Sequence, residues 1–391
     1  MTVSNYNLLS LVQKTTLIVL ISNFFSFSLN AQQTLTNTLM HDGIQREYIL
    51  YIPASYSGNV EVPLVFNFHG YGSNHTQQMN YGDFRSIANR EGFLIVHPLG
   101  TVDNNGNTHF NVGWGTSTVD DVGFTAALID EISSNYSVNQ KRIYSTGMSN
   151  GGFMSYRLAC ELSDKIAAVA SVTGTMTVGQ QNNCTTSHPV PIMEIHGTND
   201  STVPYNGNGG FESVENVLNF WVNAVNTDST PTITNIDDVN PNDNSTVEYY
   251  VYPNGDNGVQ MEHFKIINGG HTWPGSAFEI GPVTNKDIDA SEEIWKFFSK
   301  YDIDGAEQLS VDEFNEGDLT VNIYPNPTSN YLTINTIFFE PVPYRLYSVS
   351  GNVVSTGEID TVDQKINITS LASGIYFLTI KNSSYKILKT E

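Results

Sequence analysis

Charged residues are few in this chain, and positively charged ones are fewest. Only 15% of the 391 residues are charged, and 17 Lys and Arg stand against 40 Asp and Glu, which gives a formal net charge of −23. Nucleic acids and anionic membrane surfaces are bound through clustered Lys and Arg. The charge balance therefore argues against both and favours a neutral or insoluble substrate. With 39% hydrophobic residues, the chain is globular and long enough for more than one domain.

Long hydrophobic runs are also missing, with one exception near the N-terminus. Lys14 precedes an apolar stretch over residues 15–29 that ends at Asn30 and Ala31. This arrangement is typical of a signal peptide, which we place at residues 1–31. A membrane anchor is the alternative, but Ser and Asn interrupt the stretch, and a spanning helix needs about 20 apolar residues. We therefore expect an exported protein whose mature chain has no membrane span.

Cysteine is nearly absent, since Cys160 and Cys184 are the whole inventory. In an oxidising compartment such a pair favours a disulfide. The bridge would close a loop of about 24 residues and stabilise the fold by roughly 3 kcal/mol. Two separate buried thiols are the alternative, because a sequence does not show the geometry that a bridge requires.

Short β-rich runs alternate with amphipathic stretches from about residue 34 to residue 301, which indicates an α/β fold. Apolar periodicity predicts helices over residues 121–136, 211–225 and 291–301. The runs that indicate buried parallel strands are residues 64–68, 92–96, 142–145, 167–170 and 191–195. We therefore predict one domain over residues 32–303, built on a mostly parallel central sheet.

An acidic linker is predicted over residues 304–318. Between Asp302 and Asp318 there are seven carboxylates and no Lys or Arg, which is typical of a solvated segment. A calcium-binding loop starting at Asp302 is the sharper alternative, but its glycine comes too early and the third ligand is missing.

Residues 319–391 have short alternating runs separated by Asn, Pro and Gly turn signals, which predicts a small all-β sandwich. Segments 321–327, 346–351 and 374–378 resemble the C-terminal sorting domains of proteins exported by type IX secretion. The resemblance implies that the type IX machinery is a partner and that the protein is extracellular or attached to the cell surface. A carbohydrate-binding or adhesive β domain is the competing interpretation.

The segment Gly-Met-Ser-Asn-Gly at residues 147–151 lies between a β-run and a helical pattern. This is the form of a nucleophile elbow, in which a serine stands at a strained strand-to-helix turn. Gly147 and Gly151 allow the neighbouring chain to pass without side-chain clashes. We therefore predict that Ser149 is a nucleophile, although a bare Gly-x-Ser-x-Gly also occurs by chance in chains rich in Gly and Ser.

A serine nucleophile needs a base and an acid, which α/β-hydrolases supply in the order Ser, Asp, His. Asp200 follows the strand 191–195, which places it in a loop at the carboxyl edge of the sheet, where ligand sites form. An ordinary turn aspartate is the alternative for Asp200. Three other loop aspartates compete for this role, but none of them directly follows a buried β-run: Asp228, Asp237 and Asp238.

His271 is the predicted base, because its glycine-rich turn after the strand 264–267 gives the imidazole room to approach the serine. His188, His196 and His263 are the other histidines after Ser149. We interpret His196 as a structural residue below Asp200, and His263 as packed or surface-exposed.

Donors for an oxyanion are expected from two main-chain N–H groups. The N–H of Asn150 follows from the elbow itself. The second is predicted at Tyr71, in the glycine-rich turn 68–73 that follows the first central strand. A glycine loop with no catalytic part is the alternative.

With these residues in place, residues 33–301 resemble the secreted esterase family that includes poly(3-hydroxybutyrate) depolymerases, feruloyl esterases and acetylxylan esterases. The matching segments are residues 68–72, 119–124, 146–152, 195–200 and 270–275. The resemblance implies an α/β-hydrolase fold with a triad of Ser149, Asp200 and His271. It also implies a bridge between Cys160 and Cys184.

The chain departs from this family at Tyr71, where members often carry a small residue or cysteine, and it lacks their additional disulfides. Together with Trp114 and Trp273, Tyr71 would form an aromatic surface able to stack on an aromatic acyl group. Such a surface is similar to the clamp of hydrolases that cleave poly(ethylene terephthalate). The alternative is that both tryptophans only pack the loops.

We therefore expect a secreted serine carboxylic-ester hydrolase that forms an acyl-enzyme. Its substrate would be a polyester or the feruloyl or acetyl esters of plant polysaccharide. No cofactor is expected, because no metal-ligand spacing or phosphate loop is present. A serine peptidase on the same fold and a non-catalytic surface-binding protein are the alternatives.

Overall fold

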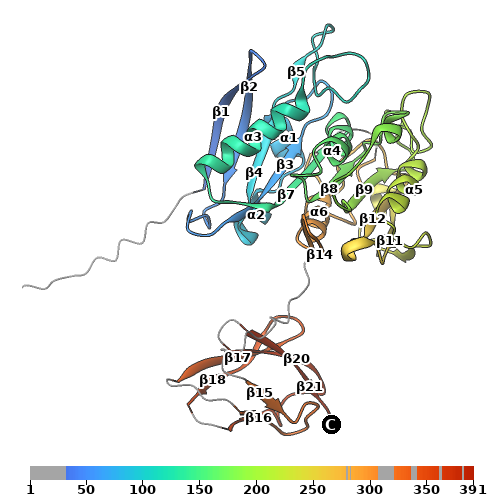
Figure 1. Cartoon of the computed structure of the whole chain (residues 1–391). Coiled ribbons are helices and arrows are strands. Elements are labelled where there is room, and N and C mark those ends of the chain that lie inside the picture. Colours follow the sequence, from blue (N-terminus) through green and yellow to red (C-terminus); the bar gives the residue numbers. More distant parts are fainter. Residues whose placement is uncertain are drawn as a thin grey trace, which may run out of the picture. The chain divides into compact units, whose positions relative to one another are not determined.

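The computed structural model describes residues 32–278, 281, 283–306, 321–335, 341–360, 363–380 and 383–391. The chain divides into two compact units, one within residues 1–308 and one within residues 309–391 (Figure 1). The predicted signal peptide lies outside the described residues, and so does the predicted linker from residue 307 onward. The first unit extends past the predicted boundary at residue 303, because strand β13 (Tyr301–Asp302) pairs with β14 (Gly305–Ala306) in a hairpin.

A ten-stranded sheet runs through the first unit in the order β1-β2-β4-β3-β7-β8-β9-β12-β11-β10. The six strands from β4 to β12 in this order are parallel, and the outer strands on both sides are antiparallel. This confirms the predicted mostly parallel sheet of an α/β-hydrolase fold. The strands are β1 (Gln33–His41), β2 (Ile44–Ile52), β3 (Val62–Phe68), β4 (Leu94–Pro98), β7 (Val138–Met148), β8 (Ala168–Val172), β9 (Ile192–Gly197), β10 (Thr232–Asn235), β11 (Thr246–Tyr252) and β12 (Met261–Ile267), and a separate small hairpin joins β5 (Thr101–Val102) to β6 (Thr108–His109).

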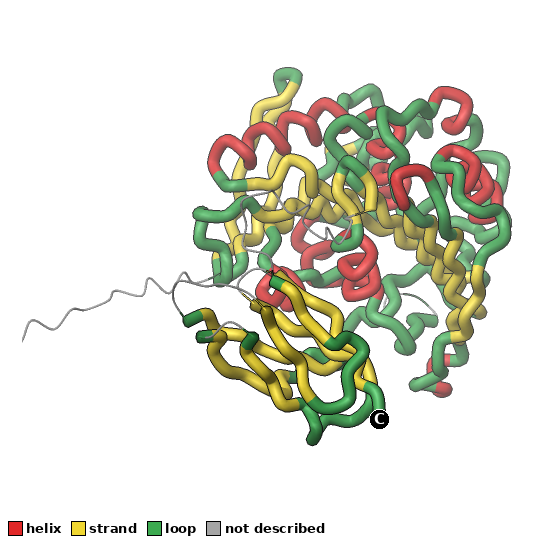
Figure 2. The backbone as a smooth tube through the Cα atoms, turned by 60° about the horizontal axis from the view of Figure 1, so that its bottom comes forward, coloured by secondary structure: helices red, strands yellow, loops and turns green. Residues whose placement is uncertain are grey.

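Helices cover both faces of this sheet, as Figure 2 shows for the red segments on either side of the yellow strands. Parallel strands covered on both faces have no solvent-facing side, which explains their continuous apolar runs. Strand β4, for example, is buried along its whole length. The helices are α1 (His75–Tyr81), α2 (Arg85–Glu91), α3 (Asp121–Asn135), α4 (Asn150–Glu161), α5 (Val214–Ala224) and α6 (Ala290–Phe298).

The three predicted helices are present with shifted ends, and side-chain caps explain the starts. Asp120 accepts the N–H of Gly123 and begins α3. Ser213 accepts the N–H of Asn216, so α5 begins at Val214 and not at residue 211. The last helix ends at Phe298 and not at residue 301.

The predicted disulfide is confirmed, since Cys160 and Cys184 are bonded. Cys160 lies in the last turn of α4, and Cys184 follows a 3₁₀ helix (Gln180–Asn183). The bond therefore ties the helix after the serine to the loop that follows β8.

The second unit consists of two antiparallel sheets that share one hydrophobic core, which confirms the predicted β-sandwich. Leu332 and Ile334 from the first sheet and Leu346, Leu378 and Ile387 from the second belong to a single buried cluster. The sheets have the orders β15-β16-β19 and β18-β17-β20-β21, with β15 (Asn322–Tyr324), β16 (Tyr331–Asn335), β17 (Val342–Ser348), β18 (Val353–Ile359), β19 (Gln364–Asn367), β20 (Gly374–Ile380) and β21 (Ser383–Lys389).

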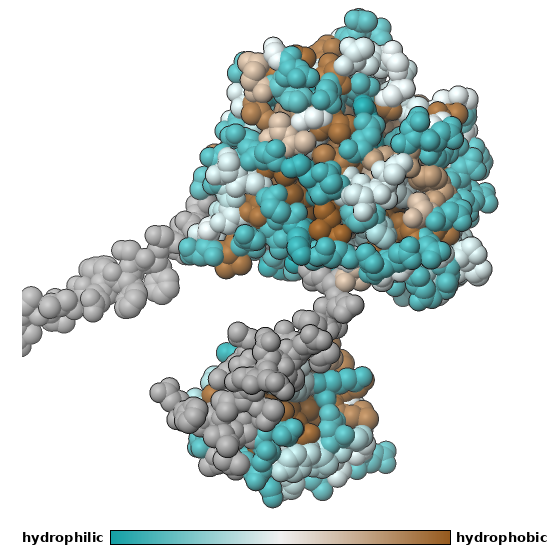
Figure 3. Space-filling model, viewed as in Figure 1, coloured by the Kyte–Doolittle hydropathy of each residue, from teal (hydrophilic) through white to brown (hydrophobic). Residues whose placement is uncertain are grey.

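The visible surface of the first unit is mainly hydrophilic, with hydrophobic residues interspersed (Figure 3). Among the described residues, none of the helices combines the length and apolar character needed to cross a membrane.

Candidate active site

Ser149 stands at the turn between β7 and α4. Its φ of 55° and ψ of −119° lie in a region that non-glycine residues rarely adopt. The turn is held by two main-chain hydrogen bonds: Ser149 N–H donates to the Val172 carbonyl (2.8 Å), and its own carbonyl accepts the Phe153 N–H (3.0 Å). This strained, hydrogen-bonded turn is the geometry predicted for a nucleophile elbow.

Two glycines make the turn possible because the end of β3 passes it closely. A Cβ at Gly147 would lie 2.6 Å from the Phe68 carbonyl oxygen, and a Cβ at Gly151 would clash with the same carbonyl. On the other side of the serine, a Cβ at Gly70 would lie 3.5 Å from Ser149 Cβ. The turn that holds Tyr71 thus begins beside the serine side chain.

Asp200 and His271 are brought together although they are 71 residues apart. His271 Nδ1 lies 2.7 Å from Asp200 Oδ2. The Asp200 side chain is fully buried, whereas the His271 side chain is 17% exposed. Asp200 Oδ1 accepts the N–H groups of Thr202 and Val203, both at 2.8 Å. Burial disfavours the ionised carboxyl, but the hydrogen bonds from His196 and His271 outweigh it and hold the pKa of Asp200 well below its usual range.

The sheet topology places Ser149, Asp200 and His271 at one edge. Strands β7, β8, β9 and β12 are parallel neighbours whose carboxyl ends lie at the same level: Met148 pairs with Val172, and Gly197 pairs with Ile266, the residue before the end of β12. The serine, the aspartate and the histidine each follow the carboxyl end of one of these strands. This is the edge at which ligands bind in open α/β sheets.

The two predicted oxyanion donors follow the carboxyl ends of the neighbouring strands β3 and β7 at this edge. In the described part of the chain, no hydrogen bond takes up the main-chain N–H of Tyr71 or of Asn150. The Asn150 side chain is buried and fixes the opposite loop, because its Oδ1 accepts the Phe110 N–H (2.7 Å) and its Nδ2 donates to the Phe110 carbonyl (3.0 Å). Sequence reasoning had given Asn150 only a main-chain role.

A buried histidine supports the turn that contains Tyr71. His69 Nε2 accepts the Gly100 N–H (3.0 Å), so the ring proton is on Nδ1, which donates to the Gly70 carbonyl (2.8 Å). Burial lowers the pKa of His69 to about 4, which keeps the ring neutral. The peptide before Tyr71 is thereby held in one orientation.

Trp273 does not present a stacking surface. Its ring is 1% exposed, lies edge-on to Phe84, and donates through Nε1 to Ser291 Oγ (3.2 Å). A Cβ at Gly82 would lie 2.9 Å from the ring. The expected contact between Trp273 and an acyl group is therefore corrected to the packing alternative, because the indole is enclosed between the helices.

Trp114, in contrast, is half-buried among aromatic rings that include Tyr71. Its centroid is 6.3 Å from that of Tyr71, 5.3 Å from Phe153 and 5.6 Å from Phe211. Tyr71 itself is 41% exposed, and its hydroxyl donates to Asp103 Oδ2 (2.5 Å). Tyr71 and Trp114 thus form an aromatic surface at the turn that carries the Tyr71 N–H, and the buried Phe153 supports it from below.

The sequence interpretation placed His196 below Asp200 but did not identify the buried polar network that His196 joins there. His196 Nδ1 lies 2.8 Å from Glu194 Oε1, and Tyr156 donates to Glu194 Oε2 (2.6 Å). All three side chains are fully buried. Glu194 falls inside the predicted buried strand 191–195, and a charged residue in such a run is the signal that could have identified the network.

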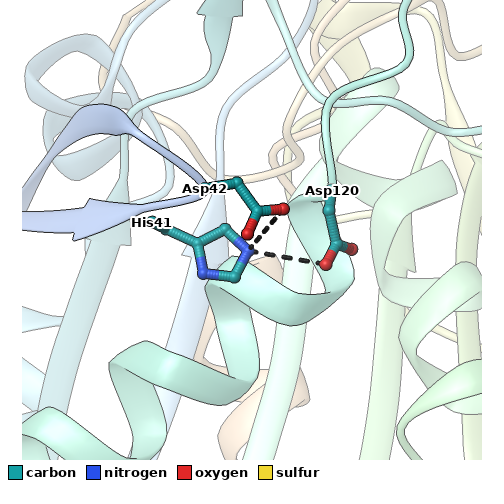
Figure 4. Close-up of side chains that lie close together, drawn as sticks. All are labelled: His41, Asp42 and Asp120. Carbon is teal, nitrogen blue, oxygen red and sulfur yellow. Dashed lines mark ion pairs between the residues drawn. The ribbon is translucent and has the colours of Figure 1, made fainter.

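One group of three potential metal ligands is found within the described ranges, formed by His41, Asp42 and Asp120 (Figure 4). His41 Nε2 is 3.4 Å from Asp120 Oδ2 and 3.8 Å from Asp42 Oδ2. Asp120 already caps α3, and the two carboxylates are 49% and 70% exposed. The group is therefore explained by a helix-capping aspartate that lies beside a histidine, and we assign no metal to it.

Comparisons with known proteins give two family matches and several relatives. Residues 119–231 match the phospholipase/carboxylesterase family, and residues 322–390 match the secretion system C-terminal sorting domain. A bifunctional acetylxylan esterase/xylanase from Neocallimastix patriciarum is 29% identical over 280 residues, which cover 70% of this chain and 36% of that protein. A probable feruloyl esterase C from Aspergillus clavatus is 34% identical over 172 residues, which cover 42% and 58% of the two chains.

Among solved structures, the acetyl xylan esterase from Aspergillus awamori aligns with a TM-score of 0.48 at 13% identity, over 69% of this chain and 99% of that one. The chain spans about a third to three fifths of the length of the two curated relatives described above, 36% and 58%. Within the first unit, residues 119–231 are thus similar to the phospholipase/carboxylesterase family, and in the second unit residues 322–390 are similar to the secretion system C-terminal sorting domain.

Proposed function

We propose that this protein is a serine carboxylic-ester hydrolase. The observation that carries the proposal is the pairing of His271 with the buried Asp200 carboxylate, at the sheet edge where Ser149 occupies a strained elbow. This is the combination of nucleophile, base and orienting acid that acyl transfer requires. The carboxylesterase family match over residues 119–231 supports it.

The proposed reaction forms and then hydrolyses an acyl-enzyme. Ser149 Oγ attacks the ester carbonyl carbon while His271 Nε2 accepts the hydroxyl proton. The N–H groups of Tyr71 and Asn150 bind the oxyanion that develops. Breaking the ester C–O bond releases the alcohol, which takes the proton from His271. Water then attacks the acyl-serine with His271 as base. As the Ser149 Oγ–acyl bond breaks, His271 returns the proton to Ser149 Oγ and the acid leaves.

Acetyl or feruloyl esters of plant polysaccharides are the proposed substrates. The names of the relatives support this class, because they are acetylxylan and feruloyl esterases. The rings of Tyr71 and Trp114 beside the oxyanion turn favour an aromatic acyl group. The exposed Tyr71 ring also favours a second class of substrate, polyesters such as poly(ethylene terephthalate) or polyhydroxybutyrate.

We further propose that the protein acts outside the cell. The C-terminal sorting-domain match supports export by the type IX machinery, to the medium or the cell surface. An extracellular esterase would reach polymeric substrates that do not enter cells.

The test is hydrolysis by the full chain of p-nitrophenyl acetate, methyl ferulate, acetylxylan and a polyhydroxybutyrate film. Ser149→Ala is expected to abolish every activity that the wild type shows. Ser155→Ala is the matched control: this buried serine lies in α4, the helix that follows Ser149, and its hydroxyl bonds to Ser145 Oγ (2.8 Å). That variant is expected to retain activity within a few-fold.

The outcomes separate the rival functions. A wild type that hydrolyses peptide amides better than esters would make it a peptidase. A folded wild type that hydrolyses none of the four esters and no peptide would indicate the non-catalytic surface-binding protein. Activity unaffected by Ser149→Ala would remove the proposed mechanism.

A further inference from the structure

The buried network under Asp200 has a chemical consequence for the proposed active site. The His196 ring, wholly enclosed in the first unit, has an acceptor at each nitrogen. Nδ1 is 2.8 Å from the Glu194 carboxyl, while Nε2 is 2.9 Å from the Val203 carbonyl and 3.5 Å from Asp200 Oδ2. A carbonyl has no proton to give, so Nε2 carries one. If Glu194 is ionised, Nδ1 carries the second.

Other contacts favour the ionised Glu194. Its second oxygen accepts the Tyr156 hydroxyl at 2.6 Å. Burial raises the pKa of Glu194 even though the hydrogen bonds from His196 and Tyr156 oppose it. Burial also disfavours a charged His196, but the hydrogen bonds to Asp200 and Glu194 outweigh burial at the imidazole and raise the pKa of His196 to about 10. A buried carboxylate requires such a partner, because an unpaired one would neutralise instead.

The remaining groups around His196 do not supply a competing charge. Tyr205 lies edge-on to the ring with centroids 5.9 Å apart, and its hydroxyl is 2.9 Å from His263 Nε2. His263 bonds through Nδ1 to the Glu194 carbonyl, and burial lowers its pKa to about 3, so it is neutral. Lys265 pairs with Glu248 at 3.4 Å.

We propose that His196 is a positioning residue of the active site: its imidazolium, held between the carboxylates of Glu194 and Asp200, fixes the Asp200 loop and weakens the attraction of that carboxylate for a proton on His271. The inference rests on the proposed esterase function. It follows from the geometry because the His196 ring anchors the Val203 carbonyl while the Val203 N–H is bound by Asp200 Oδ1. A positive charge beside Asp200 partly offsets its field at His271, which must be neutral to act as base.

His196→Gln is the variant that removes the charge while keeping an amide donor for Val203. We expect kcat/KM of this variant on p-nitrophenyl acetate to be at least tenfold lower than that of the wild type. We also expect the acid limb of its pH profile to lie about half to one pH unit higher. The limb moves up because His271 then holds its proton to higher pH. His263→Gln is the matched control: it replaces an equally buried but neutral histidine on the adjacent strand, so its acid limb is expected to stay in place.

A second measurement does not depend on activity. In wild-type protein labelled with ¹⁵N-histidine, NMR is expected to show both ring nitrogens of His196 protonated from pH 6 to pH 8.5. An unprotonated Nδ1 would place the proton on Glu194 and overturn the inference. So would an active His196→Gln enzyme whose acid limb coincides with that of wild type and of His263→Gln. Failure of the wild type to hydrolyse any ester would instead refute the proposed function and leave the NMR result to decide the charge of His196.

Discussion

Replacing Asp121 by Asn is expected to destabilise the first unit more than any surface charge change. Asp121 Oδ1 accepts from Arg46 Nη2 at 2.6 Å, and its Oδ2 accepts the Asn111 N–H at 2.7 Å. Both charged side chains are almost completely buried, with exposures of 2% for Arg46 and 1% for Asp121. The guanidinium also bonds to the Leu99 carbonyl (3.1 Å) and lies 3.9 Å from the Phe124 ring centroid.

The size of the effect follows from what the substitution leaves behind. In Asp121→Asn the Arg46 charge stays buried without a counter-charge. The amide NH₂ also replaces one of the two carboxylate oxygens, so that either Arg46 or the Asn111 N–H loses its acceptor. Breaking a buried pair in this way costs about 3–5 kcal/mol. In a unit of this size that corresponds to a melting temperature lower by roughly 10 °C. Asp130→Asn is the control, because Asp130 and Lys165 form an exposed pair (68% and 31%), and such pairs contribute less than about 1 kcal/mol.

Urea unfolding followed by tryptophan fluorescence measures this directly. The four tryptophans, at positions 114, 221, 273 and 295, all lie in the first unit, so the signal does not report the β-sandwich. The reasoning is refuted if Asp121→Asn and Asp130→Asn lower the free energy of unfolding by the same small amount. The double variant Arg46→Met with Asp121→Leu is expected to be more stable than Asp121→Asn, because it removes both charges.

Three further predictions concern the elbow, the disulfide and pH. Gly151→Ala is expected to abolish esterase activity and cost at least about 3 kcal/mol, because the new methyl group meets the Phe68 carbonyl; wild-type activity would contradict the close crossing. Replacing Cys160 and Cys184 by Ser is expected to cost roughly 3 kcal/mol in chemical denaturation, and an unchanged midpoint would show that the bridge contributes nothing. The raised pKa of His196 gives stability that is complete below about pH 6.5 and is lost as pH rises through about 10; the free energy of unfolding of His196→Gln should therefore fall less steeply than wild type between pH 7 and 10.

Local sequence patterns predicted much of this fold for a physical reason. The central strands are covered on both faces, so they appear as continuous apolar runs, as in β4. The cap that begins α3 is also local, because Asp120 lies three residues before its partner Gly123. The antiparallel outer strands were not individually predicted. Strand β1 alternates between exposed and half-buried residues, which is a weak signal at a sheet edge.

The active site was predicted where its signal is local and incompletely predicted where it depends on packing. The elbow around Ser149 follows from residues adjacent in sequence. The role of Trp273 was misjudged because its ring turns inward toward Gly82, 191 positions earlier in the chain, and no sequence pattern shows that space. Likewise, the sequence indicates only that a buried Glu194 needs hydrogen-bond partners. The fold shows that these partners are His196 and Tyr156.

The most direct test of the central claim is covalent labelling of the full chain with a fluorophosphonate, followed by peptide mass spectrometry. An activated serine forms one stable adduct with this reagent, and we predict that the adduct lies on Ser149. Labelling should disappear in His271→Ala and slow as pH falls and the imidazole takes up a proton. A folded protein that stays unlabelled, or one labelled at another serine, would contradict the claim that Ser149, His271 and Asp200 act together.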